Sequence, residues 1–262
     1  MKSLRIAATG MQAQEFNVEV ISNNIANMRT TGFKQVRAEF QDLLYQDIRR
    51  VGATSSSAGN IIPTGVQIGH GVKTGATARV MSQGNLQQTG KELDVAIRGE
   101  GFFSIQLPSG QTAYTRDGSF ELDANGALVT LDGFQVQPNI TVPNNARSIT
   151  INREGTVQVL TDNSTTPTDL GQIQLSRFVN KAGLQSIGDN LYLETPASGA
   201  AIDGTADSAG FGSVLQSFLE NSNVNAVGEL SDLIAAQRAY EMNAKVISAS
   251  DEMMSATANI VR

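Results

Sequence analysis

Apolar residues recur at every seventh position through the C-terminal stretch of the chain. This series is Leu233, Tyr240, Ile247, Met254 and Val261, and an interleaved, mostly small or polar series is Leu230, Gln237, Ala244, Asp251 and Ala258. No proline or glycine lies between Glu229 and Val261, so nothing in the sequence interrupts a helix there. The alternating spacing gives a narrow seam rather than the broad face of a helix on a large core. We expect one long helix, capped by Asn225, that needs one or two partner helices.

The beginning of the chain supplies a candidate partner. Its seven-residue series is Leu4, Met11, Val18 and Ile25, with Ala7, Gln14, Ile21 and Met28 interleaved. The helix should end near Asn27, because Thr30, Thr31 and Gly32 follow and glycine readily adopts the left-handed conformation that ends helices. One such helix could simply lie on a globular domain. A matched pair at the two ends of the chain favours a coiled coil.

The middle of the chain, from about residue 76 to 221, is predicted to be an elongated antiparallel β domain. Short stretches of β-forming residues alternate with turns, and Asn125-Gly126 separates two of them. That dipeptide predicts a hairpin with a type I′ turn, which needs positive φ at both central residues. The fold class is therefore α+β. The expected domains are 1–34 with 222–262 (helical), 35–75 (an extended arm) and 76–221 (β).

Residues 35–75 allow more than one interpretation. Phe33 to Tyr45 could form a second short helix or part of an extended arm. From Gln46 to Gly75 the abundant glycine and serine suggest a flexible linker. However, apolar residues are interspersed there, which favours an arm that packs against another surface; they are Ile61, Ile62, Val66, Ile68 and Val72.

Composition and motifs exclude several functions. The 262-residue chain has a formal charge of −6, which argues against a nucleic-acid partner. No apolar run is long enough for membrane insertion, and the polar residues after Lys2 and Arg5 argue against a cleaved signal peptide. We expect no catalytic residues, no cofactor and no metal: there is no cysteine, the lone His70 lies in a glycine-rich stretch, and Asp123–Gly126 lacks the rest of a calcium loop.

Four motifs are spread along the chain. Near its start, Ser22-Asn23-Asn24-Ile25-Ala26-Asn27 precedes Thr31-Gly32-Phe33-Lys34. In the middle lie Gly90-Lys91-Glu92-Leu93-Asp94-Val95-Ala96-Ile97, Gly99-Glu100-Gly101-Phe102-Phe103 and Tyr114-Thr115-Arg116-Asp117-Gly118-Ser119-Phe120. Toward the end, Ser222-Asn223-Val224-Asn225 precedes Gln237-Arg238-Ala239-Tyr240-Glu241. Together they resemble the axial proteins of the bacterial flagellar rod and hook, over essentially the whole chain.

The resemblance implies a structural subunit of a helical filament. Its terminal helices would form the inner tube and its β domain the outer tube of the distal rod, which carries torque across the periplasm to the hook. The implied partners are other copies of the chain, proximal rod proteins, the hook protein, the surrounding L and P rings and the flagellar export apparatus. Alternatives within the family are a proximal rod subunit or a hook subunit.

Specific residues follow from this expectation. The subunit interface would include Leu4, Met11, Val18, Asn23, Asn24, Ile25, Asn27, Leu233, Gln237, Tyr240, Ile247 and Met254. Ile61, Ile62, Val66 and Ile68 would belong to an arm that stiffens the filament. Two interpretations of a different class remain open. A peptidoglycan-cleaving enzyme would need two carboxylates in a cleft, drawn from Asp94, Glu100, Asp117 and Glu121, and an adhesin would need an exposed recognition loop.

Overall fold

The computed structural model of the chain describes residues 2–51, 64–162 and 166–260. These divide into two compact units. The helical unit consists of Met1–Ile25, Val36–Ala78 and Asn225–Arg262, and the β unit consists of Ala26–Gln35 and Arg79–Val224. Helices and antiparallel strands together confirm the α+β class.

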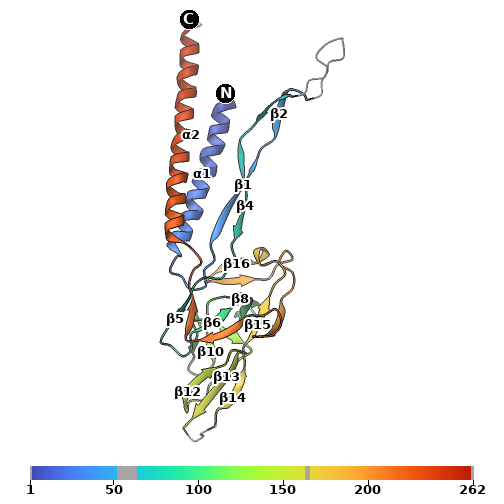
Figure 1. The fold of residues 1–262 in the computed structure, drawn as a ribbon, viewed down its shortest axis with the longest axis vertical. Coiled ribbons are helices and arrows are strands. Elements are labelled where there is room, and N and C mark those ends of the chain that lie inside the picture. The colour runs from blue at the N-terminus through green and yellow to red at the C-terminus, as the bar shows by residue number, and fades with distance from the viewer. Residues whose placement is uncertain (1, 52–63, 163–165, 261–262) are drawn as a thin grey trace. The chain divides into compact units, whose positions relative to one another are not determined.

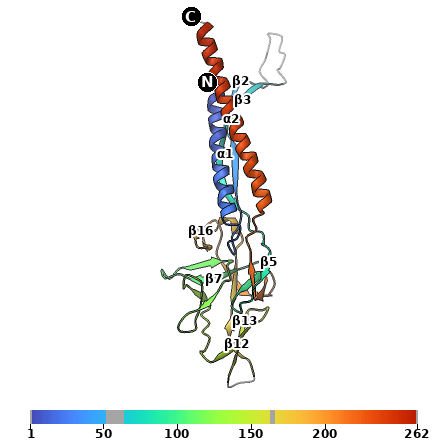
Figure 2. The same cartoon turned by 90° about the vertical axis from the view of Figure 1, so that its left-hand side faces the viewer.

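Both terminal helices are present where the sequence predicts them. Helix α1 is Lys2–Ala26 and helix α2 is Ala226–Ile260. Asn225 caps α2, because its Oδ1 accepts hydrogen bonds from the amides of Val227 and Gly228 at 3.1 and 3.3 Å. The two helices lie side by side and run in opposite directions, so the start of α1 and the end of α2 lie at the same end of the helical unit (Figures 1 and 2).

A two-stranded β-ribbon completes the helical unit. Strand β1 (Val36–Asp42) pairs with β4 (Val72–Arg79), and β2 (Tyr45–Arg49) pairs antiparallel with β3 (Val66–Gly69). The alternative of a short helix over residues 33–45 is therefore wrong, because these residues find strand partners more than twenty positions away. Ile61 and Ile62 lie outside the described residues.

The β unit contains the remaining strands. They are β5 (Leu86–Gln88), β6 (Val95–Arg98), β7 (Phe102–Gln106), β8 (Thr112–Thr115), β9 (Glu121–Leu122), β10 (Leu128–Val129), β11 (Gln135–Gln137), β12 (Ala146–Ile151), β13 (Thr156–Thr161), β14 (Thr168–Gln172), β15 (Gln174–Arg177), β16 (Gln185–Gly188), β17 (Leu191–Leu193), β18 (Ile202–Thr205), β19 (Ser213–Gln216) and β20 (Phe218–Glu220), with a 3₁₀ turn at Lys181–Gly183. The largest sheet has the order β16-β17-β8-β7-β11-β10-β9, and β15 joins it through β7 and also pairs with β18. Strands β12, β13 and β14 form a separate antiparallel sheet.

Strand β7 is buried on both faces. Successive side chains of a strand point to opposite sides, so Phe103 and Ile105 enter the larger core while Phe102 enters a smaller one. The smaller core also contains Tyr114 and Phe178, whose rings meet edge to face with centroids 4.8 Å apart. This double burial explains why residues 102–105 read as a continuous apolar and small run rather than a clean alternation.

The predicted hairpin at Asn125-Gly126 is present, but its turn type differs. Strands β9 and β10 pair antiparallel, with Leu128 opposite Leu122. The amide of Gly126 donates to the carbonyl of Asp123, and only Gly126 of the dipeptide has positive φ, at 79°. The type I′ prediction is therefore wrong. The Asp123 carboxylate accepts hydrogen bonds from the amides of Asn125 and Ala127, which stabilises the turn while Asn125 keeps ordinary backbone geometry.

Two glycines of the β unit provide a matched test of this hairpin. Gly126 and Gly133 have almost the same φ, 79° and 82°. A Cβ at Gly126 would overlap the carbonyl oxygen of Val142, whereas a Cβ at Gly133 would have nothing within 4 Å. We expect Gly133→Ala to lower the free energy of unfolding by about 1–2 kcal/mol, the cost of positive φ alone, and Gly126→Ala to lower it clearly more. Thermal or urea unfolding measures both, and equal losses would contradict the close approach to Val142.

Candidate assembly interface

The two helices of the helical unit meet in a single antiparallel register. Ser3 faces Ser250, with their hydroxyl oxygens 3.3 Å apart, and Asn24 donates from Nδ2 to Oε2 of Glu229 at 3.2 Å. Between them, a Cβ placed on Gly10 would lie 2.9 Å from Nδ2 of Asn243. Each advance of seven residues along α1 is therefore matched by a decrease of seven residues along α2.

The fully buried residues of α2 are small or polar rather than large and apolar. Glu229, Ala236 and Ser250 are buried there, and Asn243 is half-buried. On α1, the buried residues are Ala7, Ala13, Val20, Ile21 and Asn24. Glycine in a helix interior costs about 1 kcal/mol relative to alanine, but at position 10 it leaves the space that Asn243 occupies. We refer to this contact as the polar seam.

The side chain of Asn24 joins three elements of the helical unit. Its Nδ2 donates to the carbonyl of Val36 at 2.8 Å as well as to Glu229, and its Oδ1 accepts from the amide of Val36 at 2.9 Å. Asn24 is buried, so these bonds form away from water, where an unmade bond is costly. Its amide therefore fixes the end of α1 against both the start of β1 and the first turn of α2.

The ribbon is also attached to α1 farther along the helix. The amide of Val72 donates to Oγ1 of Thr9 at 3.4 Å, and the ammonium of Lys2 donates to the side chain of Gln46. Gly71, with φ of 110°, passes so close to Thr9 that a Cβ would overlap the Thr9 hydroxyl. Helix α1 thus contacts α2 on one side and the ribbon on another, as Figure 1 shows.

The interface residues expected from sequence fall into two groups. Half-buried positions are Leu4, Met11, Val18, Ile25, Asn27, Leu233, Ile247 and Met254, and exposed positions are Asn23, Gln237, Tyr240, Val66 and Ile68. Asn24 belongs to neither group, because it is fully buried. Its hydrogen bonds described above all join it to residues of its own chain. Asn27 accepts a hydrogen bond at Oδ1 from the hydroxyl of Thr30 at 3.1 Å.

Large apolar side chains lie on the outside of the helical unit. On α2 the exposed set is Val227, Leu230, Ile234, Tyr240, Met242, Val246 and Met253, and along the ribbon it is Phe40, Leu44, Tyr45, Ile48, Val51, Val66 and Ile68. Val227 is 74% exposed and Leu44 is 87% exposed. Grouped exposed apolar residues of this kind mark interaction surfaces. Of these, only Tyr240, Val66 and Ile68 are among the interface and arm residues expected from the sequence, because the seven-residue spacing on α2 does not mark the outward side of the helix.

The β unit contains a buried charge cluster that involves the Lys34 motif. The Lys34 ammonium lies 2.5 Å from Oε1 of Glu220, and Nε of Arg116 lies 3.5 Å from Oε2 of the same carboxylate. Lys34, Glu220 and Arg116 are only 1%, 2% and 5% exposed. Burial lowers the pKa of Lys34, and the Glu220 charge opposes that shift. Arg116 also donates from Nη2 to the carbonyl of Gly99 at 2.7 Å, and its guanidinium lies over the ring of Phe102.

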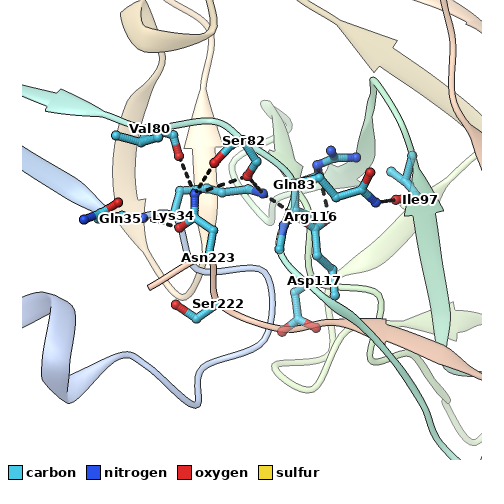
Figure 3. Close-up of polar contacts among 12 residues, drawn as sticks. Lys34, Gln35, Val80, Ser82, Gln83, Ile97, Arg116, Asp117, Ser222 and Asn223 are labelled. Atoms are coloured by element: carbon cyan, nitrogen blue, oxygen red, sulfur yellow. Dashed lines mark hydrogen bonds and ion pairs between the residues drawn. The ribbon is translucent and has the colours of Figure 1, made fainter. Parts of the chain in front are cut away.

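Asn223 supports this cluster through the backbone. Its Oδ1 accepts from the amide of Gln35 at 2.7 Å, and its Nδ2 donates to the carbonyls of Val80 and Ser82 at 2.8 and 3.2 Å (Figure 3). The ammonium of Lys34 donates to the same Ser82 carbonyl. Two of the sequence motifs, one near each end of the chain, therefore meet in the β unit, where their polar residues have structural roles.

The candidate enzymatic residues also have structural partners. Asp94 accepts from the hydroxyl of Thr89 at 2.6 Å, Asp117 accepts from Ser119, Glu121 pairs with Lys91, and Glu100 pairs with Lys181. His70 Nδ1 lies 2.8 Å from the carbonyl of Leu44. Among the described residues, no group of three potential metal ligands is found, and neither helix is long and apolar enough to cross a membrane.

Comparisons with known proteins match the chain over nearly its whole length. Residues 4–34 match the family described as flagella basal body rod protein, residues 96–159 match the flagellar hook protein FlgE/F/G D1 domain, and residues 215–260 match the flagellar basal body rod FlgEFG protein C-terminal family. The chain is 58% identical to the flagellar basal-body rod protein FlgG of Caulobacter vibrioides over 99% of both chains. It is 38% identical to the FlgG of Bacillus subtilis over the whole of both. A hook protein FlgE of Helicobacter mustelae is 45% identical over 52% of this chain and 30% of its own.

Asn24 can be tested by removing its amide. We expect Asn24→Ala to lower the free energy of unfolding by about 2–4 kcal/mol, because the amide and carbonyl of Val36 and the buried Glu229 each lose a partner. Amide hydrogen exchange at Val36 should become faster. The exposed Ser22→Ala, two residues earlier in α1, serves as the control and should change little. An Asn24→Ala variant as stable as the control would show that the three-element junction does not depend on this side chain.

The charge cluster makes a separate prediction for the β unit. Lys34→Met should destabilise it by about 3–5 kcal/mol, since a buried carboxylate then loses its closest cation. Adding Glu220→Gln should recover part of this loss, because the amide carries no charge. Unfolding of the two single variants and the double variant gives the coupling energy. Additive losses would contradict direct coupling between Lys34 and Glu220.

Proposed function

The chain belongs to the family of flagellar basal-body rod proteins, and we propose that it forms the distal rod, a stiff helical tube that carries torque to the hook. It is a structural protein of the flagellar basal body, so the enzyme and adhesin interpretations are set aside. Within the family, the hook relative matches about half of the chain, whereas the rod relatives match its full length. That difference favours a rod subunit over a hook subunit.

One observation carries the proposal. In the helical unit the polar seam is turned inward, and the large apolar residues of α2 and the ribbon are turned outward. A single copy leaves this apolar surface in water, which is unfavourable at about 25 cal/mol per Å². Neighbouring copies would cover it, and contacts between different surfaces of successive copies produce a filament rather than a closed ring.

Each part of the chain has a place in the proposed tube. Residues 1–34 and 222–262 would form the inner tube, where coiled-coil contacts between helices of neighbouring copies involve Leu4, Met11, Val18, Asn23, Ile25, Asn27, Leu233, Gln237, Tyr240, Ile247 and Met254. Asn24 would support this interface from within its own chain. Residues 35–75 would form the arm, and residues 76–221 the outer tube. The partners would be proximal rod proteins, the hook protein, the L and P rings and the flagellar export apparatus, with the tube crossing the periplasm.

The ribbon would provide the stiffness. A straight tube under torque must resist sliding between neighbouring copies, and the exposed apolar residues at the outer part of the ribbon would resist it by packing against the next copy. Ile48, Val66 and Ile68 are exposed in the described part of this segment. Hydrogen bonds of the β2–β3 ladder would keep the arm extended while it bears this load.

Paired substitutions in the ribbon test this function. Ile48→Ser with Ile68→Ser should leave both helices and the polar seam intact, so tubes should still assemble. They should bend more easily, because the contacts that resist sliding are weakened. Electron micrographs of purified tubes give the persistence length, with Gln67→Ser, at an exposed polar position on the same strand, as the control. Tubes as straight as the wild type would assign the stiffness to another surface.

A further inference from the structure

A groove in the β unit brings two exposed arginines together. It has a volume of about 510 Å³. The residues that line it include Arg98, Glu100, Arg153, Asp207, Phe211 and Ser213. Arg98 and Arg153 are exposed, and neither forms an ion pair within the described part of the chain. The β unit as a whole has more acidic than basic residues, so this concentration of positive charge is a local exception.

The backbone fixes the positions of both arginines. Arg98 is the last residue of β6, where it lies opposite Ser213 in the antiparallel ladder with β19. Arg153 lies in the turn between β12 and β13, and its carbonyl accepts a hydrogen bond from the amide of Val214 at 2.9 Å. The two arginines are therefore attached to consecutive residues of one strand. A ligand between them does not have to order the backbone, which keeps the cost of binding low.

A loop that is itself held by hydrogen bonds forms another wall of the groove. The amide of Asp207 donates to the carbonyl of Gly212 at 2.9 Å, and the amide of Gly212 donates to the carbonyl of Glu100 at 2.7 Å. A Cβ on Gly212 would lie only 2.5 Å from the carbonyl oxygen of Arg98, so glycine is needed for this close approach. The groove is thus preformed, with glycine backbone rather than side chains beside the arginines.

The charges along the groove limit what can bind there. Guanidinium groups bind planar carboxylates and phosphates through paired N–H donors. Glu100 is already paired with Lys181, but Asp207 places a second carboxylate in the same lining. A nucleic acid or an anionic membrane presents many closely spaced phosphates, which Asp207 and the net negative charge of the β unit would repel. A peptide fits better, because it combines a carboxylate with backbone N–H groups that can donate to Asp207.

We propose that this groove binds the carboxylate of a peptide segment of a partner protein. Arg98 and Arg153 hold the carboxylate oxygens, and Asp207 accepts a hydrogen bond from a backbone amide of the same segment. An acidic side chain and a chain terminus present the same planar group, so the chemistry is shared by both sources. Every residue of the groove belongs to the β unit. The inference therefore does not depend on the proposed self-assembly, and either can fail alone.

Short peptides serve as probes of the full-length chain. Acetyl-Ala-Glu-Ala amide carries a side-chain carboxylate, acetyl-Ala-Ala-Ala carries a terminal carboxylate, and acetyl-Ala-Gln-Ala amide carries neither. Isothermal titration calorimetry measures the affinity of each peptide, with inorganic phosphate as a fourth probe. Arg98→Gln and Arg153→Gln each remove one cation from the groove. The matched control is Arg147→Gln, at an exposed position of β12 outside the groove, and circular dichroism with thermal melting establishes that every variant folds.

We expect at least one carboxylate peptide to bind about tenfold or more tightly than the glutamine peptide, because hydrogen bonds to a charged group are stronger than neutral ones. The tighter of the two carboxylate peptides identifies the source of the carboxylate. Arg98→Gln and Arg153→Gln should each weaken its binding about fivefold. Arg147→Gln should leave the affinity unchanged, and added salt should weaken binding to the wild type.

Three results would overturn the inference. Equal affinity for the carboxylate and glutamine peptides, including no binding of either, would show that the arginines do not recognise a peptide carboxylate. Phosphate binding as tight as that of the better peptide would indicate a site for any small anion. An equal loss of affinity in Arg147→Gln and in the two groove variants would indicate attraction by overall charge rather than a defined site.

Discussion

The helical unit depends on the amide of Asn24. One side chain bonds both backbone groups of Val36 and the carboxylate of Glu229, so it joins α1 to β1 and to α2. Because Asn24 and Glu229 are buried, neither can exchange its partner for water without cost. The antiparallel helix register and the path of the ribbon along α1 both start from this junction. The outward position of the large apolar residues follows from that register.

The sequence predicts the elements of this fold better than their contacts. The seven-residue periodicities locate α1 and α2 and the Asn225 cap, and alternating residues locate most strands of the β unit. Periodicity alone does not say which side of a helix meets its own chain. Here Glu229, Ala236 and Ser250 are buried inside the subunit, while the more apolar Leu230 and Ile234 face outward. In an assembling protein, the most apolar side of a helix can be reserved for another copy.

Three other features that the sequence did not predict have local or long-range causes. At Asn125-Gly126 the dipeptide predicts the hairpin, but the Asp123 side chain stabilises a turn in which Asn125 keeps negative φ. The sequence did not decide between helix and strand for β1, because its partner β4 comes only after β2 and β3 in the sequence. The role of Lys34 could not be read from its neighbours in sequence, because its ion-pair partner is Glu220, 186 positions away. From the sequence alone, a charged residue next to glycine is expected to lie on the surface in contact with water.

The same separation between Lys34 and Glu220 has a consequence for the order of folding. The β unit cannot complete its buried charge cluster until Glu220 has been synthesised, 186 residues after Lys34. Contacts between residues so distant in sequence carry a large loop-closure cost and form slowly. The local hairpins of the β unit can therefore form early, while the segment that contains Lys34 stays without its partner. Completion of the β unit is thus delayed by its own topology, and a nascent chain lacks the charge cluster until Glu220 has been added.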